Sequence, residues 1–215
     1  NYYPNCEFFK KYEEFNNYIK NLQYNEKKKI DYISICSPNH LHLKHLTSSL
    51  KLGCNTICEK PLVGNLDEVH KLKELEKETG KKIFNILQLR YHKTIKNLKK
   101  EVEKSQSKTK FEVELTYITS RGSWYYKSWK NNFKKSFGIV SNIGIHFFDM
   151  LQFIFGKFIK NSLFCYDNST ASGFLEFEKA NVKWFLSVDK QYLPENLPPN
   201  QTTFRNIKIF DKVIE

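Results

Sequence analysis

The sequence predicts an α/β domain with a parallel sheet, followed by an α+β domain with an open, mostly antiparallel sheet and one long helix. Up to residue 108, short apolar runs alternate with amphipathic helical segments, as in parallel strands joined by helices. From residue 109 on, patterns of alternating apolar and polar residues dominate and flank one long apolar segment. We therefore expect domains at 1–108 and 109–215.

The centre of the first domain is the stretch 31–61. Its apolar run 33–36 is followed by leucines at helical spacing up to Gly53, and a second apolar run follows at 56–58. Two buried strands joined by a helix form a parallel βαβ unit. Polar groups just past the carboxyl ends of such strands line the ligand crevice of an open sheet. Lys60, in Glu-Lys-Pro directly after the second strand, is the first candidate for chemistry; the alternative is a surface lysine paired with Glu59.

Three further elements complete the first domain. Apolar residues at spacings of three and four predict an amphipathic helix over 8–22. Asn65 has the pattern of an N-cap for a helix that ends at Gly80. A third strand is expected over 82–89 and a helix over 95–102.

In the second domain, residues 111–119 alternate as in a half-buried strand, and a helix is expected over 138–156. The remaining strands are expected over 164–166, 172–178, 181–188 and 204–210.

The predicted helix carries its polar residues on one face. Asn142, His146 and Asp149 are four and three residues apart, so they share one side, and the opposite side is apolar. A polar stripe on so apolar a helix should face a cavity or polar partners. The alternative is that His146 is a core histidine bonded to Asp149.

Cations and aromatic residues are interleaved in one short segment, which contains Arg121, Trp124, Tyr125, Trp129 and Lys130. This mixture suits a sugar ring, a uracil face and a diphosphate. It would equally suit stacking on single-stranded nucleic acid or a subunit contact.

Composition narrows the classes of partner. The net charge is +12, which could suit nucleic acid, but the lysines lie mostly on polar helix faces, so we expect no nucleic-acid partner. The five cysteines have no zinc spacing, so we expect no metal site and a cytoplasmic location. No apolar run approaches the length of a membrane span, so we expect no membrane partner.

The motifs SPNHLH, CEKP and GIHFFD, in this order, resemble the Gfo/Idh/MocA oxidoreductase family. The longer blocks DYISICSPNHLH, ICEKPLVGN, ILQLRYH and SNIGIHFFDMLQFIFG resemble its bacterial UDP-N-acetylglucosaminuronate 3-dehydrogenases, which act in lipopolysaccharide and O-antigen biosynthesis. The resemblance implies a Rossmann-type cofactor domain and an α+β substrate domain. It also implies a fragment, with the Gly-rich first βα unit missing before Asn1 and further sheet missing after Glu215.

The resemblance implies roles for individual residues. Lys60 and His146 are the expected catalytic residues. The expected cofactor-binding residues are Ser37, Pro38, Asn39, His42, Glu59, Lys60 and Gln88. The expected substrate-binding residues are Arg90, Arg121, Tyr125, Trp129, Asn142 and His146. Many members of the family have Asp where this chain has Asn142, and an amide cannot take up a proton, so we interpret Asn142 as a hydrogen-bonding residue for substrate.

The expected reaction is oxidation of the C3 hydroxyl of a UDP-N-acetyl-hexosaminuronate, with NAD as cofactor and NADP as an alternative. The resemblance implies 2-oxoglutarate as hydride acceptor and a homo-oligomer, either tetramer or dimer. One alternative is another dehydrogenase of the family that acts on a free sugar or inositol. An alternative from a different class is a basic nucleic-acid-binding protein.

Overall fold

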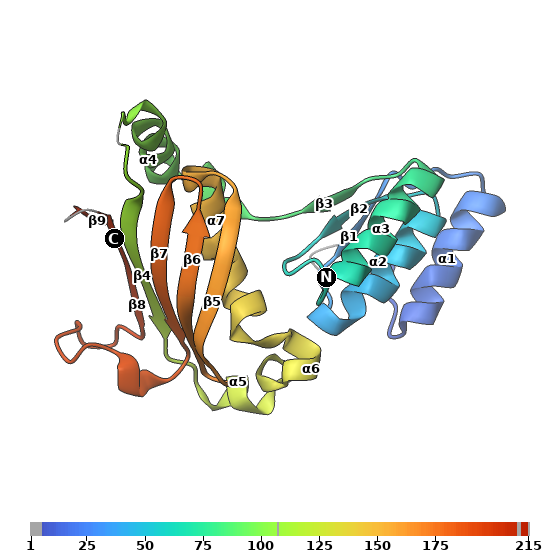
Figure 1. Cartoon of the computed structure of the whole chain (residues 1–215). Coiled ribbons are helices and arrows are strands. Elements are labelled where there is room, and N and C mark those ends of the chain that lie inside the picture. The colour runs from blue at the N-terminus through green and yellow to red at the C-terminus, as the bar shows by residue number, and fades with distance from the viewer. Residues whose placement is uncertain (1–5, 107, 210–211, 215) are drawn as a thin grey trace. The chain divides into compact units, whose positions relative to one another are not determined.

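The computed structural model describes residues 6–106, 108–209 and 212–214, and these form two compact units (Figure 1). The first unit extends to Asn85 but omits the segments 38–41 and 60–64. The second unit contains these two segments together with the chain from Ile86 onwards. Each unit has its own sheet, so the predicted order of a parallel sheet followed by a mixed sheet is confirmed.

In the part of the first unit that the structure describes, the sheet has three parallel strands, in the order β1 (Tyr32–Ile35), β2 (Asn55–Cys58) and β3 (Ile83–Asn85). The register pairs Ile35 with Cys58 and Cys58 with Asn85, so the three strands end at the same level. The prediction that the third strand continues to residue 89 was wrong. The strand ends at Asn85 because β2, its one neighbour among the described residues, ends opposite it, and Gln88–Tyr91 forms a 3-10 turn instead.

Three helices belong to this unit, namely α1 (Tyr12–Tyr24), α2 (His42–Lys51) and α3 (Leu66–Thr79). The predicted ends of α3 are confirmed. The Asn65 side chain accepts a hydrogen bond of 2.9 Å from the Glu68 N–H, and Gly80 ends the helix with a left-handed φ of 66°.

As far as the described residues extend, the sheet of the second unit has six strands in the order β5-β6-β7-β4-β8-β9. Its strands are β4 (Phe111–Thr119), β5 (Phe158–Tyr166), β6 (Thr170–Phe177), β7 (Ala180–Ser187), β8 (Thr203–Ile209) and β9 (Lys212–Ile214). Among the described strands of this sheet, only β4 and β7 pair in parallel. β5 begins six residues earlier than predicted, because this edge strand is exposed along most of its length and so lacks an alternating pattern. The predicted strand end at residue 210 lies outside the described residues.

The helices of the second unit are α4 (Lys93–Lys104), α5 (Ser123–Lys127), α6 (Phe133–Ser136) and α7 (Ile145–Phe155). A π-helical turn, Val140–Gly144, leads into α7, so the predicted long helix is present but irregular at its start. α4 packs on α7, and Ile95 and Val102 are buried in the same core as the second sheet. The compact units therefore do not follow the boundary that we placed after residue 108.

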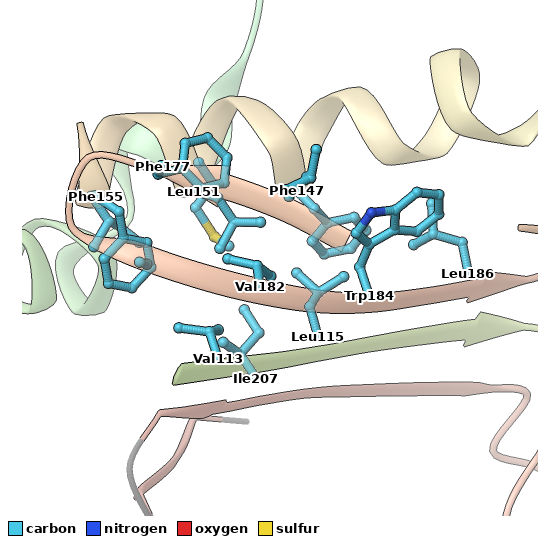
Figure 2. Close-up of a cluster of buried hydrophobic side chains, with 14 of the residues drawn as sticks. Val113, Leu115, Phe147, Leu151, Phe155, Phe177, Val182, Trp184, Leu186 and Ile207 are labelled. Atoms are coloured by element: carbon cyan, nitrogen blue, oxygen red, sulfur yellow. The ribbon is translucent and has the colours of Figure 1, made fainter. Parts of the chain in front are cut away.

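α7 covers one face of the six-stranded sheet (Figure 2). Its residues Phe147, Leu151 and Phe155 point toward side chains of β4 and β7, including Val113, Leu115, Val182 and Leu186. The apolar side predicted for this helix is confirmed, since Ile143, Phe147, Met150 and Ile154 are all buried. Burial of these side chains fixes the rotation of α7 about its own axis, and the polar stripe consequently lies outside the apolar side that the core covers.

Among the described residues, one helical stretch, Phe133–Phe155, has the length and the apolar composition of a membrane span. Our sequence prediction missed this stretch. Phe137 and Gly138, with φ angles of 63° and 77°, interrupt it, and α7 buries its apolar side on the sheet. Core packing therefore explains its hydropathy.

We expect Leu151→Ala to destabilise the second unit by about 2–5 kcal/mol, because Leu151 is fully buried and the truncation leaves a cavity. All three tryptophans belong to this unit, so tryptophan fluorescence during urea unfolding follows it alone. The matched control is Leu163→Ala on β5, where the side chain is 55% exposed and the expected change is within about 0.5 kcal/mol. Equal effects of the two changes would contradict this assignment of the core.

Candidate functional site

The aligned carboxyl ends of β1, β2 and β3 bring polar groups to one edge of the first sheet. The Glu59 N–H donates to the carbonyl oxygen of Ile35 at 3.0 Å. The Asn85 side chain donates to the carbonyl oxygens of Cys58 (2.9 Å) and Glu59 (3.2 Å). The carboxylate of Glu59 is left exposed at this edge. The structure thus places Glu59 directly beyond the strand ends, as the βαβ pattern predicts.

Ser37, which follows β1, is held by two histidines of α2. The Nε2 atom of the fully buried His42 lies 2.9 Å from the Ser37 carbonyl oxygen, and His45 Nδ1 lies 3.0 Å from Ser37 Oγ. The Tyr12 ring stacks on His45 with 4.1 Å between centroids. Because His42 lies inside the unit, its observed contact fixes the turn after β1, and its cofactor role stays a prediction.

The residues that follow Ser37 make their contacts in the second unit. Asn39 is 4% exposed, and its side-chain N–H donates to the carbonyl oxygen of Ser136 at 2.7 Å. The sequence offered no signal for Ser136, because a lone serine in a lysine-rich loop resembles any surface residue. Gln88 is exposed in the 3-10 turn Gln88–Tyr91.

Lys60 contacts the start of the long helix. Its Nζ donates to the carbonyl oxygen of Asn142 at 2.6 Å and lies 3.4 Å from the Asn142 side-chain oxygen. Asn142 belongs to the π-helical turn before α7, and such turns are frequent at functional sites. The structure therefore joins the CEKP motif to the block SNIGIHFFDMLQFIFG, although 82 positions separate Lys60 and Asn142.

The polar stripe of the long helix faces partners along its length, as predicted. Asn142 contacts Lys60, Asp149 contacts Arg90, and the carbonyl oxygen of Phe153 accepts a 3.0 Å hydrogen bond from Lys99. His146 lies between the first two pairs, one helical turn after Asn142, and is half-buried.

Arg90 is bonded to an internal carboxylate. Its Nε donates to Asp149 Oδ2 at 2.5 Å, and its Nη2 donates to Oδ1 of the same carboxylate. The hydrogen bond with Asp149 raises the pKa of Arg90. The Arg90 side chain is 40% exposed, whereas that of Asp149 is 8% exposed. A substrate could therefore meet Arg90 only through the other N–H donors of its guanidinium, and this predicted role stays a proposal.

The cluster of cations and aromatic residues is assembled as a folded turn. Lys130 Nζ lies 5.3 Å from the ring centre of Trp124 and 5.9 Å from that of Trp129, so it is held by cation–π contacts. Tyr125 is 3% exposed in the core, and burial raises the pKa of its hydroxyl. The Nε of Arg121 is buried and has no hydrogen-bond partner among the described residues. In this cluster, the Arg121 Nε–H is therefore a buried donor that could bond to an acceptor atom of a ligand.

These groups are suited to acid–base chemistry at a hydroxyl or ketone. Lys60 offers N–H donors, and His146, on the same face of the helix as Asn142, is a residue type that can accept or return a proton near neutral pH. Within residues 6–106, 108–209 and 212–214, no group of three His, Cys, Asp or Glu side chains could hold a metal ion.

We expect Arg90→Ala to destabilise the second unit by about 1–3 kcal/mol, because the nearly buried Asp149 carboxylate loses its charged donor. Urea unfolding followed by tryptophan fluorescence measures this loss. Asp149→Ala and the double variant complete a double-mutant cycle, and a coupling energy near zero would refute the importance of the pair. Arg205→Ala, at an exposed position of β8, is the control.

We expect local stability around β1 and α2 to fall as the pH drops through about 6.5. Burial, and then the charge of Lys44, lowers the pKa of His45 below its ordinary value of 6.5. The unfolded state therefore binds a proton more readily than the folded state, and acid favours opening. Amide hydrogen exchange near pH 7.5 and 5.5 (approximate values that bracket the ordinary pKa) measures this effect. In His45→Gln the pH dependence should shrink, and an unchanged dependence would assign it to other groups.

Two family models match most of the chain. The NAD-binding Rossmann-fold model of the Gfo/Idh/MocA oxidoreductase family matches residues 4–86. The C-terminal alpha/beta domain model of the same family matches residues 109–192. Among curated relatives, D-glucoside 3-dehydrogenase of Escherichia coli is 23% identical over 128 residues, and myo-inositol 2-dehydrogenase of Thermotoga maritima is 29% identical over 128 residues. These alignments cover 60% of this chain but only 36% and 37% of the relatives.

Among solved structures, the WlbA (WbpB) dehydrogenase from Thermus thermophilus is 42% identical, with a TM-score of 0.91 over 98% of this chain and 68% of that chain. It was crystallised with NAD and alpha-ketoglutarate, and with NAD and UDP-GlcNAcA. The WlbA dehydrogenase from Bordetella pertussis, at 18% identity and a TM-score of 0.74 over 89% of this chain and 60% of that chain, shares the fold. With both domain models matched in order, the chain belongs to the Gfo/Idh/MocA oxidoreductase family.

Proposed function

We propose that this protein is an NAD-dependent oxidoreductase that oxidises the C3 hydroxyl of a UDP-N-acetyl-hexosaminuronate for surface-polysaccharide biosynthesis. The contact between Lys60 Nζ and Asn142, one helical turn before His146, is the observation that carries the proposal. It joins a strand-end lysine to the polar stripe of α7. The Thermus thermophilus structures, with NAD and UDP-GlcNAcA bound, support the choice of cofactor and sugar.

The first unit has features that suit a dinucleotide. Its three parallel strands end in register, and the exposed carboxylate of Glu59 at this edge can accept hydrogen bonds from ribose hydroxyls. Ser37, Pro38, Asn39, His42 and Gln88 complete the proposed cofactor set. When bound, the nicotinamide supplies the acceptor for the hydride that leaves C3. NADP is kept as the alternative to NAD.

In this proposal, Lys60 and His146 act together on the proton of the C3 hydroxyl. Asn142 offers two acceptor oxygens to Lys60, which holds the lysine side chain in one place. From there Lys60 in its neutral form takes the hydroxyl proton, assisted by His146, and the ammonium that results donates an N–H to the C3 oxygen. The amide of Asn142 carries no charge and cannot take up a proton, so in this proposal it orients Lys60 as well as the substrate.

The proposed substrate is an anion, so we propose cationic side chains among the residues that bind it. Arg121 has a buried donor that lacks a partner among the described residues, and the remaining donors of Arg90 could add a second cationic contact. The aromatic ring of Trp129 suits a sugar or uracil face. Tyr125 is buried in the core under this turn, and we propose that it supports substrate binding from there.

The proposal extends to the partners of the reaction. We infer that 2-oxoglutarate accepts the hydride in a second half-reaction, because the Thermus thermophilus protein was crystallised with that compound and NAD. A homo-oligomer in the cytoplasm remains part of the proposal.

A dehydrogenase that acts on a free sugar or inositol is the second candidate. The curated relatives, a D-glucoside and a myo-inositol dehydrogenase, favour this alternative. Nucleic-acid binding rests on the charge of +12 and on the interleaved cations and aromatic residues of the segment 121–130, and RNA affinity that falls steeply with salt would support it.

We expect Lys60→Met to abolish turnover of UDP-N-acetylglucosaminuronate, because the methionine side chain has no N–H for the C3 oxygen. The protein is mixed with the sugar nucleotide, NAD and 2-oxoglutarate, and product mass reports the loss of two hydrogen atoms. Far-ultraviolet circular dichroism checks that the fold is intact. Lys134→Met, in the exposed part of α6, is the matched control and should keep full activity.

A panel of substrates separates the two dehydrogenase candidates. The proposal requires turnover that depends on the UDP group. Turnover of inositol or a free hexose, with none of the sugar nucleotide, would replace the proposed substrate. Retention of most activity by Lys60→Met would remove Lys60 from the catalytic role.

A further inference from the structure

Two short segments that follow strands of the first sheet make their contacts in the second unit. Pro38–Leu41 follows β1 and Lys60–Gly64 follows β2, yet both group with the second unit. Both segments contact one short turn, Ser136–Gly138, which links α6 to the π-helical turn. We call these three residues the clamp turn.

The first contact is a hydrogen bond to the backbone of the clamp turn. The buried side chain of Asn39 donates to the carbonyl oxygen of Ser136 at 2.7 Å. Ser136 is itself 1% exposed and is held inside the turn. Its hydroxyl donates to the carbonyl oxygen of Asn132 at 3.0 Å and accepts from the Gly138 N–H at 3.2 Å.

The second contact is a close approach between Gly64 and the Phe137 ring. A Cβ atom placed on Gly64 would lie 2.8, 2.9 and 3.0 Å from three ring carbons of Phe137. Ordinary carbon–carbon contacts are about 3.5–4.0 Å. Position 64 therefore has room only for glycine while the ring stays where it is.

The backbone of the clamp turn prevents an easy retreat of the ring. Phe137 and Gly138 are both left-handed, with φ of 63° and 77°, and a bulky residue rarely adopts this conformation. Gly138 is enclosed, since a Cβ there would meet the Tyr166 hydroxyl and the Phe133 ring. These two rings contact each other edge to face, with 5.8 Å between centroids. Such a conformation persists where the surroundings determine it, and these contacts do so.

The segment 60–64 is therefore held at both ends by neighbouring parts of one stretch of chain. At one end, Lys60 Nζ is bonded to Asn142. At the other end, Gly64 lies under Phe137, five residues before Asn142. A shift of the Phe137 ring would move the backbone that carries Lys60, although Phe137 itself has no chemistry to contribute.

We propose that Phe137 is a positioning residue, which sets the place of the Lys60 ammonium through its contact with Gly64. The importance of this contact for turnover rests on the proposed function. The contact itself can be tested without any activity, through the side-chain environment of Lys60.

The test uses Gly64→Ala in the otherwise unchanged protein. With isotope-labelled lysine, the NMR signal of the Lys60 side chain is identified by its loss in Lys60→Arg. We expect Gly64→Ala to move this signal toward those of exposed lysines and to speed hydrogen exchange of its ammonium protons at least severalfold. We also expect kcat to fall by about tenfold or more with a smaller change in KM, since misplacement by about 1 Å can cost on the order of 100-fold.

Two further variants separate positioning from a general loss of stability. Gly80, unlike Gly64, is left-handed, with φ of 66°, so Gly80→Ala strains the backbone, but a Cβ there meets open space, and the Lys60 signal should stay unchanged. Gly64→Ala combined with Phe137→Leu restores room and should recover most of the Lys60 signal and of kcat.

The outcomes are distinguishable from failure of the proposed function. An unchanged Lys60 signal in Gly64→Ala, whatever happens to kcat, would overturn the positioning role. So would equal shifts in Gly64→Ala and Gly80→Ala, or failure of the combined variant to recover the signal. If the signal moves as expected while Lys60→Met stays fully active, Phe137 positions Lys60 as proposed, and only the catalytic assignment is lost.

Discussion

Burial of α7 on the six-stranded sheet is the packing interaction on which the arrangement of the second unit depends. Its apolar side contacts strands β4 and β7 across the core, which sets the rotation of the helix. Once that rotation is set, Asn142, His146 and Asp149 lie outside the apolar side that the core covers. A polar stripe so placed needs partners, because buried polar groups are costly without hydrogen bonds. Lys60 and Arg90 supply them from segments that follow strands of the first sheet.

The first unit contributes in a different way, through the register of its parallel strands. Ile35, Cys58 and Asn85 lie side by side, so the chain leaves the sheet three times at one edge. The segments that follow carry Asn39, Lys60 and Arg90, and each makes a side-chain hydrogen bond to the second unit's helical segments. Within the second unit, Asn39 and Lys60 are bonded to irregular parts of the fold: a turn with two successive left-handed residues and a π-helical turn.

Patterns with a clear physical period were predicted well. Strand β4, the caps of α3 and both faces of α7 follow from alternation, capping chemistry and helical spacing, which are local properties. Elements with weak periods were predicted poorly. β5 lies exposed at an edge of the sheet and shows no alternating pattern. The third strand ends at Asn85 because β2 ends opposite it, and the residues after Asn85 carry no sequence signal for this end. The candidate site followed the same division. Position and spacing singled out Lys60 and the polar stripe as candidates, whereas Phe137 and Gly64 carry no signal, because their relation is a contact between distant segments.

The sequence by itself determined the two kinds of sheet, the amphipathic helix and the motifs that identify the family, since these depend on periodicity and on residue types at short spacing. The tertiary structure alone decided the partners. It paired Arg90 with Asp149, joined Lys60 to Asn142 and placed the Phe137 ring over Gly64. Each of these contacts joins residues far apart in the chain. Their geometry is set by how side chains fill space once the core has formed, and no local pattern records it.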